Sequence, residues 1–130
     1  MSRVRVVLDT SALLAYARLR GMATAELVAM VEEEGGAALV GIPAGCFLTT
    51  YFQLREDEQE RLVRLATKID GVTVILPLTG TDTVEAVQLG PVMGHAIVEA
   101  RRREAYLATY DVSQALLELP ARRVLPLEDD

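Results

Sequence analysis

Short apolar runs alternate with amphipathic segments along the whole chain. The apolar runs, rich in β-branched residues, predict buried strands at residues 4–8, 37–41, 72–76, 106–108 and 123–125. Between them, apolar residues recur at helical spacing. The expected helices are residues 12–20, 24–34, 44–54, 57–69, a segment capped by Thr81 or Asp82 that ends at Leu89, 92–103 and 113–119. Because no hairpin signals occur, the pattern predicts an α/β fold: a three-layer α/β/α sandwich with a central, mostly parallel sheet.

The size and composition indicate a single folded domain over residues 1–130. Hydrophobic residues make up 51% of the 130 residues, which excludes disorder. The longest uncharged and mostly apolar stretch, residues 37–48, is too short and too interrupted to span a bilayer. Cys46 is the only cysteine, and no secretory signal opens the chain, so a reducing cytoplasm is expected. The acidic tail, residues 127–130, is expected to be frayed.

The chain carries a net charge of −6, with a sequence pI near 4.8. This charge argues against avid, sequence-blind binding to nucleic acid, which depends on neutralising phosphates. It does not exclude an enzyme that acts on nucleic acid and in which a bound metal ion offsets the negative charge of an acidic pocket.

Two aspartates stand where functional sites of parallel sheets lie. Asp9 follows the strand at residues 4–8, and Asp111 follows the strand at residues 106–108. Such sites lie at the carboxyl ends of the strands. Either aspartate can equally be the cap of the helix that follows it. If the two strands are neighbours, both carboxylates face one crevice, where a hard cation such as Mg²⁺ or Mn²⁺ would relieve their repulsion.

Three other α/β families that begin with a strand-end aspartate fit poorly. A receiver domain needs acidic neighbours of Asp9 and a lysine late in the chain, whereas Lys68, the only lysine, lies in a predicted helix. A haloacid-dehalogenase-like phosphatase needs an aspartate at the position of Ser11. A phosphate-binding loop needs a GxxxxGK[ST] string, and the sequence has none.

Three further segments carry recognisable motifs: LDTSALLAY at residues 8–16, VGIPAGCFLTTY at 40–51 and HAIVEARRREAYLATYD at 95–111, which ends in a TxD pattern. Together they resemble the PIN domain family, a metal-dependent nuclease fold used by VapC-type toxins. The length and the order of elements agree as well. The resemblance implies a PIN-like sandwich that covers the whole chain.

The resemblance also implies a site. The family holds one or two divalent ions with three or four acids, of which Asp9 and Asp111 match two, with Ser11 and Thr109 supporting them. Two family acids are missing, because Thr49 and Met93 or one of its neighbours stand at their positions. Two further candidates, both on the predicted helix at 92–103, are His95 and Glu99, which share a helix face. For His95, packing or hydrogen bonding is the alternative role.

Two functions follow from the resemblance. The first is a toxin-type, Mg²⁺- or Mn²⁺-dependent endoribonuclease of a toxin–antitoxin pair, with reduced or lost activity, in which Asp9 and Asp111 hold the metal. The second is a catalytically inactive PIN-like module that binds other proteins, as the two missing acids favour. The expected partners are an antitoxin protein, an RNA substrate and a second copy of the chain in a homodimer. Binding to a membrane is not expected.

Overall fold

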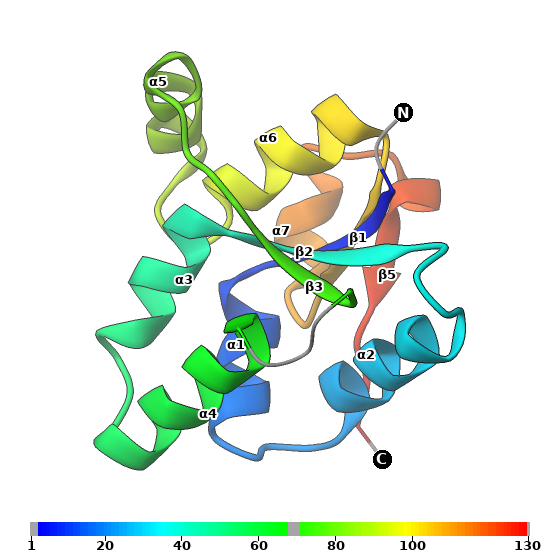
Figure 1. Ribbon diagram of the computed structural model, residues 1–130. Coiled ribbons are helices and arrows are strands. Elements are labelled where there is room, and N and C mark those ends of the chain that lie inside the picture. The colour runs from blue at the N-terminus through cyan, green and yellow to red at the C-terminus, as the bar shows by residue number, and fades with distance from the viewer. Residues whose placement is uncertain (1–2, 68–70, 130) are drawn as a thin grey trace.

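Five parallel strands form a single sheet in the part of the chain that is described. The structure is a computed structural model, and it describes residues 3–67 and 71–129. The strand order is β3-β2-β1-β4-β5, and every neighbouring pair is parallel (Figure 1). The strands are β1 (Val4–Leu8), β2 (Leu39–Pro43), β3 (Thr73–Leu76), β4 (Tyr106–Thr109) and β5 (Val124–Pro126).

Helices cover both faces of this sheet. They are α1 (Thr10–Ala17), α2 (Ala23–Glu33), α3 (Ala44–Tyr51), α4 (Glu56–Thr67), α5 (Gly80–Leu89), α6 (Gly94–Arg103) and α7 (Val112–Leu116), and a short 3₁₀ turn spans Ala121–Arg123. Right-handed crossovers place α1, α2 and α4 on one face and α6 and α7 on the other. Figure 1 shows this separation, with α5 packed outside α6. The predicted three-layer α/β/α sandwich is therefore confirmed.

The centre of the sheet is the most deeply buried part of the molecule. β1 pairs with β2 on one side and with β4 on the other. Both of its faces are covered, so four of its five side chains are buried, and only Arg5 is exposed. A strand buried on both faces reads as a continuous apolar run rather than as an alternating one. This is why the pattern at residues 4–8 predicts the strand correctly.

Element boundaries differ from the predicted ones where proline and threonine act locally. β2 begins and ends two residues later than predicted, because Pro43 has extended backbone angles and closes the strand before α3 begins. The cap of α5 is Thr79 rather than Thr81 or Asp82: its hydroxyl oxygen accepts the amide of Asp82 at 3.3 Å. The predicted end of the 57–69 helix at Ile69 lies outside the described residues.

The acidic tail is held against the body rather than frayed over residues 127–129. Leu127 is buried, and its amide donates to the carbonyl of Thr109 at 2.9 Å. The carboxylate of Asp129 accepts the amide of Ala23 and the hydroxyl of Tyr110, both at 3.1 Å. The tail therefore ties β4 to the first turn of α2. None of the described helices is long and apolar enough to cross a membrane.

Candidate acidic site

Asp9 lies at the carboxyl end of β1, beside the end of β4. The register pairs Leu8 with Ala108, so the next residues along the two strands, Asp9 and Thr109, come together. Asp9 is also the N-cap of α1, because its carboxylate accepts the amide of Ala12 at 3.0 Å. The same side chain therefore ends a central strand and starts a helix.

Hydrogen bonds surround the Asp9 carboxylate on both oxygens. Oδ1 accepts the Ser11 hydroxyl at 2.6 Å in addition to the Ala12 amide, and Oδ2 accepts the Thr109 hydroxyl at 2.6 Å. The two hydroxyl oxygens lie 3.3 Å apart, and each hydroxyl donates its hydrogen bond to Asp9. Their lone pairs accept backbone amides instead, from Tyr110 to Ser11 at 3.0 Å and from Asp111 to Thr109 at 2.9 Å. The chain thus builds a closed network around one carboxylate.

Burial dominates the electrostatics of Asp9. Its side chain is fully buried, and loss of hydration raises the pKa of Asp9 above its usual value. The hydrogen bonds from Ser11, Thr109 and Ala12 act in the opposite direction, because they stabilise the charged form. The negative charge of Asp111 adds to the upward shift of the pKa. The two aspartates are therefore close enough to interact through their charges.

Asp111 has a different environment. It is exposed, and its Oδ1 accepts the amide of Gln114 and the hydroxyl of Ser113, both at 3.3 Å, which makes it the N-cap of α7. It borders a hollow of about 290 Å³. The rest of that lining is mainly apolar: Leu89, Gly90, Pro91, Val92, Met93 and Gln114.

No carboxylate replaces the two acids that the resemblance implies. Thr49 directs its hydroxyl to the carbonyls of Gly45 and Pro91, at 3.0 and 3.1 Å, and so ties α3 to the loop before α6. Met93 is buried beside the hollow. Across residues 3–67 and 71–129, no three His, Cys, Asp or Glu side chains group so that they could hold a metal ion. The donor set at this site is therefore too small for a two-metal centre.

His95 and Glu99 belong to a separate buried cluster on α6. The His95 Nδ1 atom accepts the amide of Gly45 at 3.0 Å, and its Nε2 atom lies 3.7 Å from the Glu99 carboxylate. Burial lowers the pKa of His95, and the charges of Glu99 and Asp82 oppose that shift. The sequence places these two residues on one helix face, and their side chains lie next to each other in the structure.

The cluster continues to the end of α6 and onto α5. Glu99 is bound by Arg102 at 3.2 Å and by Arg103 at 2.7 Å, and Arg102 also pairs with Asp82 on α5. Sequence reasoning missed the pairing of Asp82 with Arg102, because twenty residues separate them and only the packing of α5 on α6 brings them together.

Comparisons with known proteins support the fold. No protein-family model matches the sequence, and no curated protein resembles it significantly. Fourteen chains of solved structures match. One belongs to the crystal structure of VapBC2 from Rickettsia felis bound to a DNA fragment from its promoter. The TM-score is 0.66 and the identity 11%, over 96% of this chain and 100% of the other. The chain therefore shares the PIN-like, three-layer architecture of that structure.

Proposed function

We propose that this chain is a PIN-like protein that acts by binding a partner protein, and that it has lost metal-dependent hydrolysis of RNA. The observation that carries the proposal is the state of the acidic site. Asp9 is buried and accepts three hydrogen bonds, and apolar side chains fill the wall where further carboxylates would be needed.

The chemistry of phosphodiester cleavage explains why these changes matter. Two-metal hydrolysis relies on several carboxylates that hold the ions against the attacking water and the leaving oxygen. Here Thr49 supplies a hydroxyl that already donates hydrogen bonds to two carbonyls. Met93 supplies a buried thioether. A thioether is a soft ligand that a hard Mg²⁺ ion avoids. The fold is retained, but only two aspartates, Asp9 and Asp111, remain as carboxylate ligands for a metal ion.

The partner in this proposal is an antitoxin-type protein, in the cytoplasm. VapBC2, whose fold this chain shares, was crystallised on DNA from its own promoter. A protein that has lost hydrolysis can still bind an antitoxin-type protein, because partner binding depends on the surface of the protein and not on the acidic site. A homodimer is compatible with the same role.

A second candidate function is a ribonuclease that uses one metal ion. It is favoured by the placement of Asp9 and Asp111 after neighbouring strands, where the charge of one acts on the pKa of the other. In that case Asp9 and Asp111 would hold Mg²⁺ or Mn²⁺, and Ser11 and Thr109 would orient Asp9.

One experiment separates the two functions. The purified chain is titrated with Mn²⁺ by calorimetry up to roughly 1 mM and is incubated with RNA in the same buffer. We expect neither saturable binding nor cleavage. Cleavage that requires Mn²⁺ and disappears in both Asp9→Asn and Asp111→Asn would establish the ribonuclease and refute the proposal.

A restored site provides the positive control. The double variant Thr49→Glu/Met93→Asp places one carboxylate at the first missing position of the resembled family and one at or beside the second. We expect this variant to bind Mn²⁺ at least about tenfold more tightly than the wild type, provided that its circular dichroism spectrum is unchanged. Each single variant should show a smaller gain.

A further inference from the structure

A polar hollow lies between the end of α1 and the start of α4. It measures about 510 Å³, within the range of roughly 300–1,000 Å³ that is typical of ligand sites. We call it the arginine hollow, and it is lined by Arg18, Arg20, Gln53, Arg55 and Glu58. Asp9 caps the start of α1 and Arg18 caps its end, so about 13 Å of helix, at roughly 1.5 Å per residue, separates this hollow from the acidic site.

The lining of the arginine hollow carries more positive than negative charge. It contains three guanidiniums and one carboxylate, that of Glu58. Glu58 is buried, and its carboxylate accepts the amide of Arg55 at 2.9 Å and lies 3.4 Å from the Arg55 guanidinium. No carboxylate of the described residues forms an ion pair with Arg18 or Arg20. Two positive charges therefore stand uncompensated in a chain whose net charge is −6.

A carboxylate beside the hollow does not change this balance. Asp57 lies 3.5 Å from the Arg55 guanidinium and 3.6 Å from that of Arg61. The ion-paired group at the start of α4 thus consists of two arginines, Arg55 and Arg61, and two carboxylates, Asp57 and Glu58. This group is neutral as a whole, so Asp57 leaves the two charges at the end of α1 uncompensated.

Backbone hydrogen bonds fix the position of both free arginines. The amide of Arg20 donates to the carbonyl of Ala15 at 2.9 Å, a bond that closes the end of α1. Leu19 has a φ of 56°, the left-handed conformation in which the chain commonly turns out of a helix. The Arg18 guanidinium donates to the backbone carbonyl of Gln53 at 3.1 Å. Because that acceptor is neutral, the side chain is held in place and its charge stays available.

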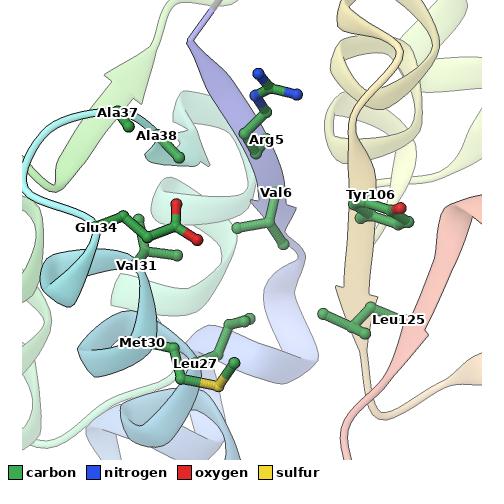
Figure 2. A pocket seen from close by; sticks show the side chains of 10 residues that line it. All are labelled: Arg5, Val6, Leu27, Met30, Val31, Glu34, Ala37, Ala38, Tyr106 and Leu125. Atoms are coloured by element: carbon green, nitrogen blue, oxygen red, sulfur yellow. The ribbon is translucent and has the colours of Figure 1, made fainter.

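Other hollows of the molecule do not share this excess of charge. A hollow of about 430 Å³ lies between α2 and the strands β4 and β5 (Figure 2). Figure 2 shows one guanidinium, Arg5, and one carboxylate, Glu34, among mainly apolar side chains. The charges of that lining balance, so they select no ligand. The arginine hollow differs because its charge selects an anion.

We infer that the arginine hollow binds the oligophosphate group of a small ligand, either free pyrophosphate or the phosphates of a nucleotide. A guanidinium can donate two parallel hydrogen bonds to phosphate oxygens, and two uncompensated guanidiniums match a compact anion of two or more charges. A long polyanion such as RNA is a poorer occupant, because the net charge of −6 repels the phosphates that extend beyond the hollow. This ligand site goes beyond the protein-binding function proposed above.

The lining also predicts what the hollow does not distinguish. Its described side chains are three arginines, a glutamine and a glutamate, and none of them is an aromatic ring on which a base could stack. Recognition therefore depends on the phosphates, and the identity of a nucleobase should matter little.

The test uses pyrophosphate as the probe. The intact chain is titrated by calorimetry in a buffer of about 50 mM ionic strength without phosphate or divalent cations. We expect saturable binding with a Kd of about 1 mM or below, and amide shifts in NMR spectra confined to residues 18–20 and 53–58. ATP distinguishes the two sources of the group: a Kd within about threefold of that for pyrophosphate assigns the hollow to nucleotides, and no binding of ATP assigns it to free oligophosphate.

Matched variants separate the hollow from general charge attraction. Arg18→Gln and Arg20→Gln each remove one uncompensated charge and should weaken binding of pyrophosphate at least about fivefold. Arg20→Lys keeps the charge but loses the paired donors, so it should weaken binding by less. Arg122→Gln makes the same change at an exposed position outside the hollow and should leave the Kd within about twofold. Unchanged circular dichroism spectra confirm that the variants are folded.

Four outcomes would overturn the inference. Pyrophosphate does not bind, or Arg20→Gln binds it as tightly as the wild type does. Citrate, a carboxylate anion of similar charge, binds as tightly as pyrophosphate, so that the hollow does not select phosphate. A short RNA oligonucleotide displaces pyrophosphate and binds more tightly, so that the occupant is a nucleic acid. The proposed function fails separately, through Mn²⁺-dependent cleavage of RNA.

Discussion

At the scale of single residues, Asp9 is the point where strand, helix and site meet. It caps α1, holds the hydroxyls of Ser11 and Thr109, and lies fully buried. Three donors point at one carboxylate, so its removal leaves buried polar groups without a partner. This cost is larger than the value of the hydrogen bonds themselves.

Asp9→Ala is therefore expected to lower the free energy of unfolding by about 3 kcal/mol. Asp9→Asn keeps one acceptor oxygen, so it should lower the free energy of unfolding by less. Asp111→Ala removes only an exposed helix cap and should cost about 1 kcal/mol or less. Urea unfolding followed by circular dichroism measures all three. An Asp9→Ala variant as stable as Asp111→Ala would show that the network contributes little.

His95 predicts a dependence of stability on pH. Burial lowers the pKa of His95 below its usual 6.5, so the unfolded chain takes up a proton before the folded chain does. The free energy of unfolding should consequently fall as the pH drops below about 6.5, until the folded imidazole is itself protonated. Above about pH 7.5 the contribution is complete.

Thermal unfolding of the wild type and His95→Gln over this range measures the effect. Glutamine can still accept the amide of Gly45 but does not titrate, so its curve should be flatter between about pH 7.5 and 5.5. Parallel curves for the two proteins would contradict the prediction.

The candidate site was partly readable from the sequence at this scale. Asp9 and Asp111 stand out because each stands at or just after the end of a strand, and the pairing of β1 with β4 places these two strand ends side by side. The hydrogen bond from the Thr109 hydroxyl to Asp9 was not readable, because it joins side chains 100 positions apart. The same limit hid Asp82, which meets Arg102 only through the packing of α5 on α6.

At the scale of elements, α5 is attached to the body chiefly through α6. Besides the Asp82–Arg102 pair, Arg101 reaches Glu85 at 3.4 Å. The closest approach lies at Gly94, the first residue of α6: a Cβ atom there would stand 2.0 Å from the carbonyl oxygen of Ala86. Backbone lies against backbone at this point, so no side chain can rotate away to make room.

Gly94→Ala should force α5 away from α6 and lower the free energy of unfolding by about 2–3 kcal/mol. Gly80→Ala is the matched control, because a Cβ at this first residue of α5 meets nothing within 4 Å. It should be neutral or raise stability by about 0.5 kcal/mol, since alanine restricts the unfolded chain. Equal melting temperatures for the two variants would mean that the α5–α6 contact can relax.

The order and type of the elements were predictable because each strand and helix carries its own periodic pattern. The ends were not, because they depend on local contacts such as the Thr79 cap of α5 and the extended backbone of Pro43. The hollow between α2 and the strands β4 and β5 was not predictable either. A sequence pattern gives the apolar face of an element but not the extent to which its neighbours cover it.

At the scale of the whole molecule, the described C-terminal residues close the structure. Leu127 packs into the core, and Asp129 joins α2 to the loop after β4. The tail holds elements from the first and last parts of the chain together, although its composition is acidic. Its contacts oppose fraying over residues 127–129.

Removal of residues 127–130 should lower the free energy of unfolding by about 2 kcal/mol, chiefly through the lost burial of Leu127. Asp129→Ala alone should cost about 1 kcal/mol, because the first turn of α2 loses an acceptor. Glu128→Ala, on an exposed side chain, should change stability by less than about 0.5 kcal/mol. A truncated chain that melts with the wild type would show that the tail contributes nothing.

The pairing of β1 with β4 also has a consequence for biosynthesis. The Asp9–Thr109 bond joins residues 100 positions apart, so one edge of the central strand stays open until the ribosome has made the last quarter of the chain. Contacts of such long range fold slowly. A nascent chain that stalls before Tyr106 cannot complete its core, and it exposes an apolar strand edge to chaperones and proteases.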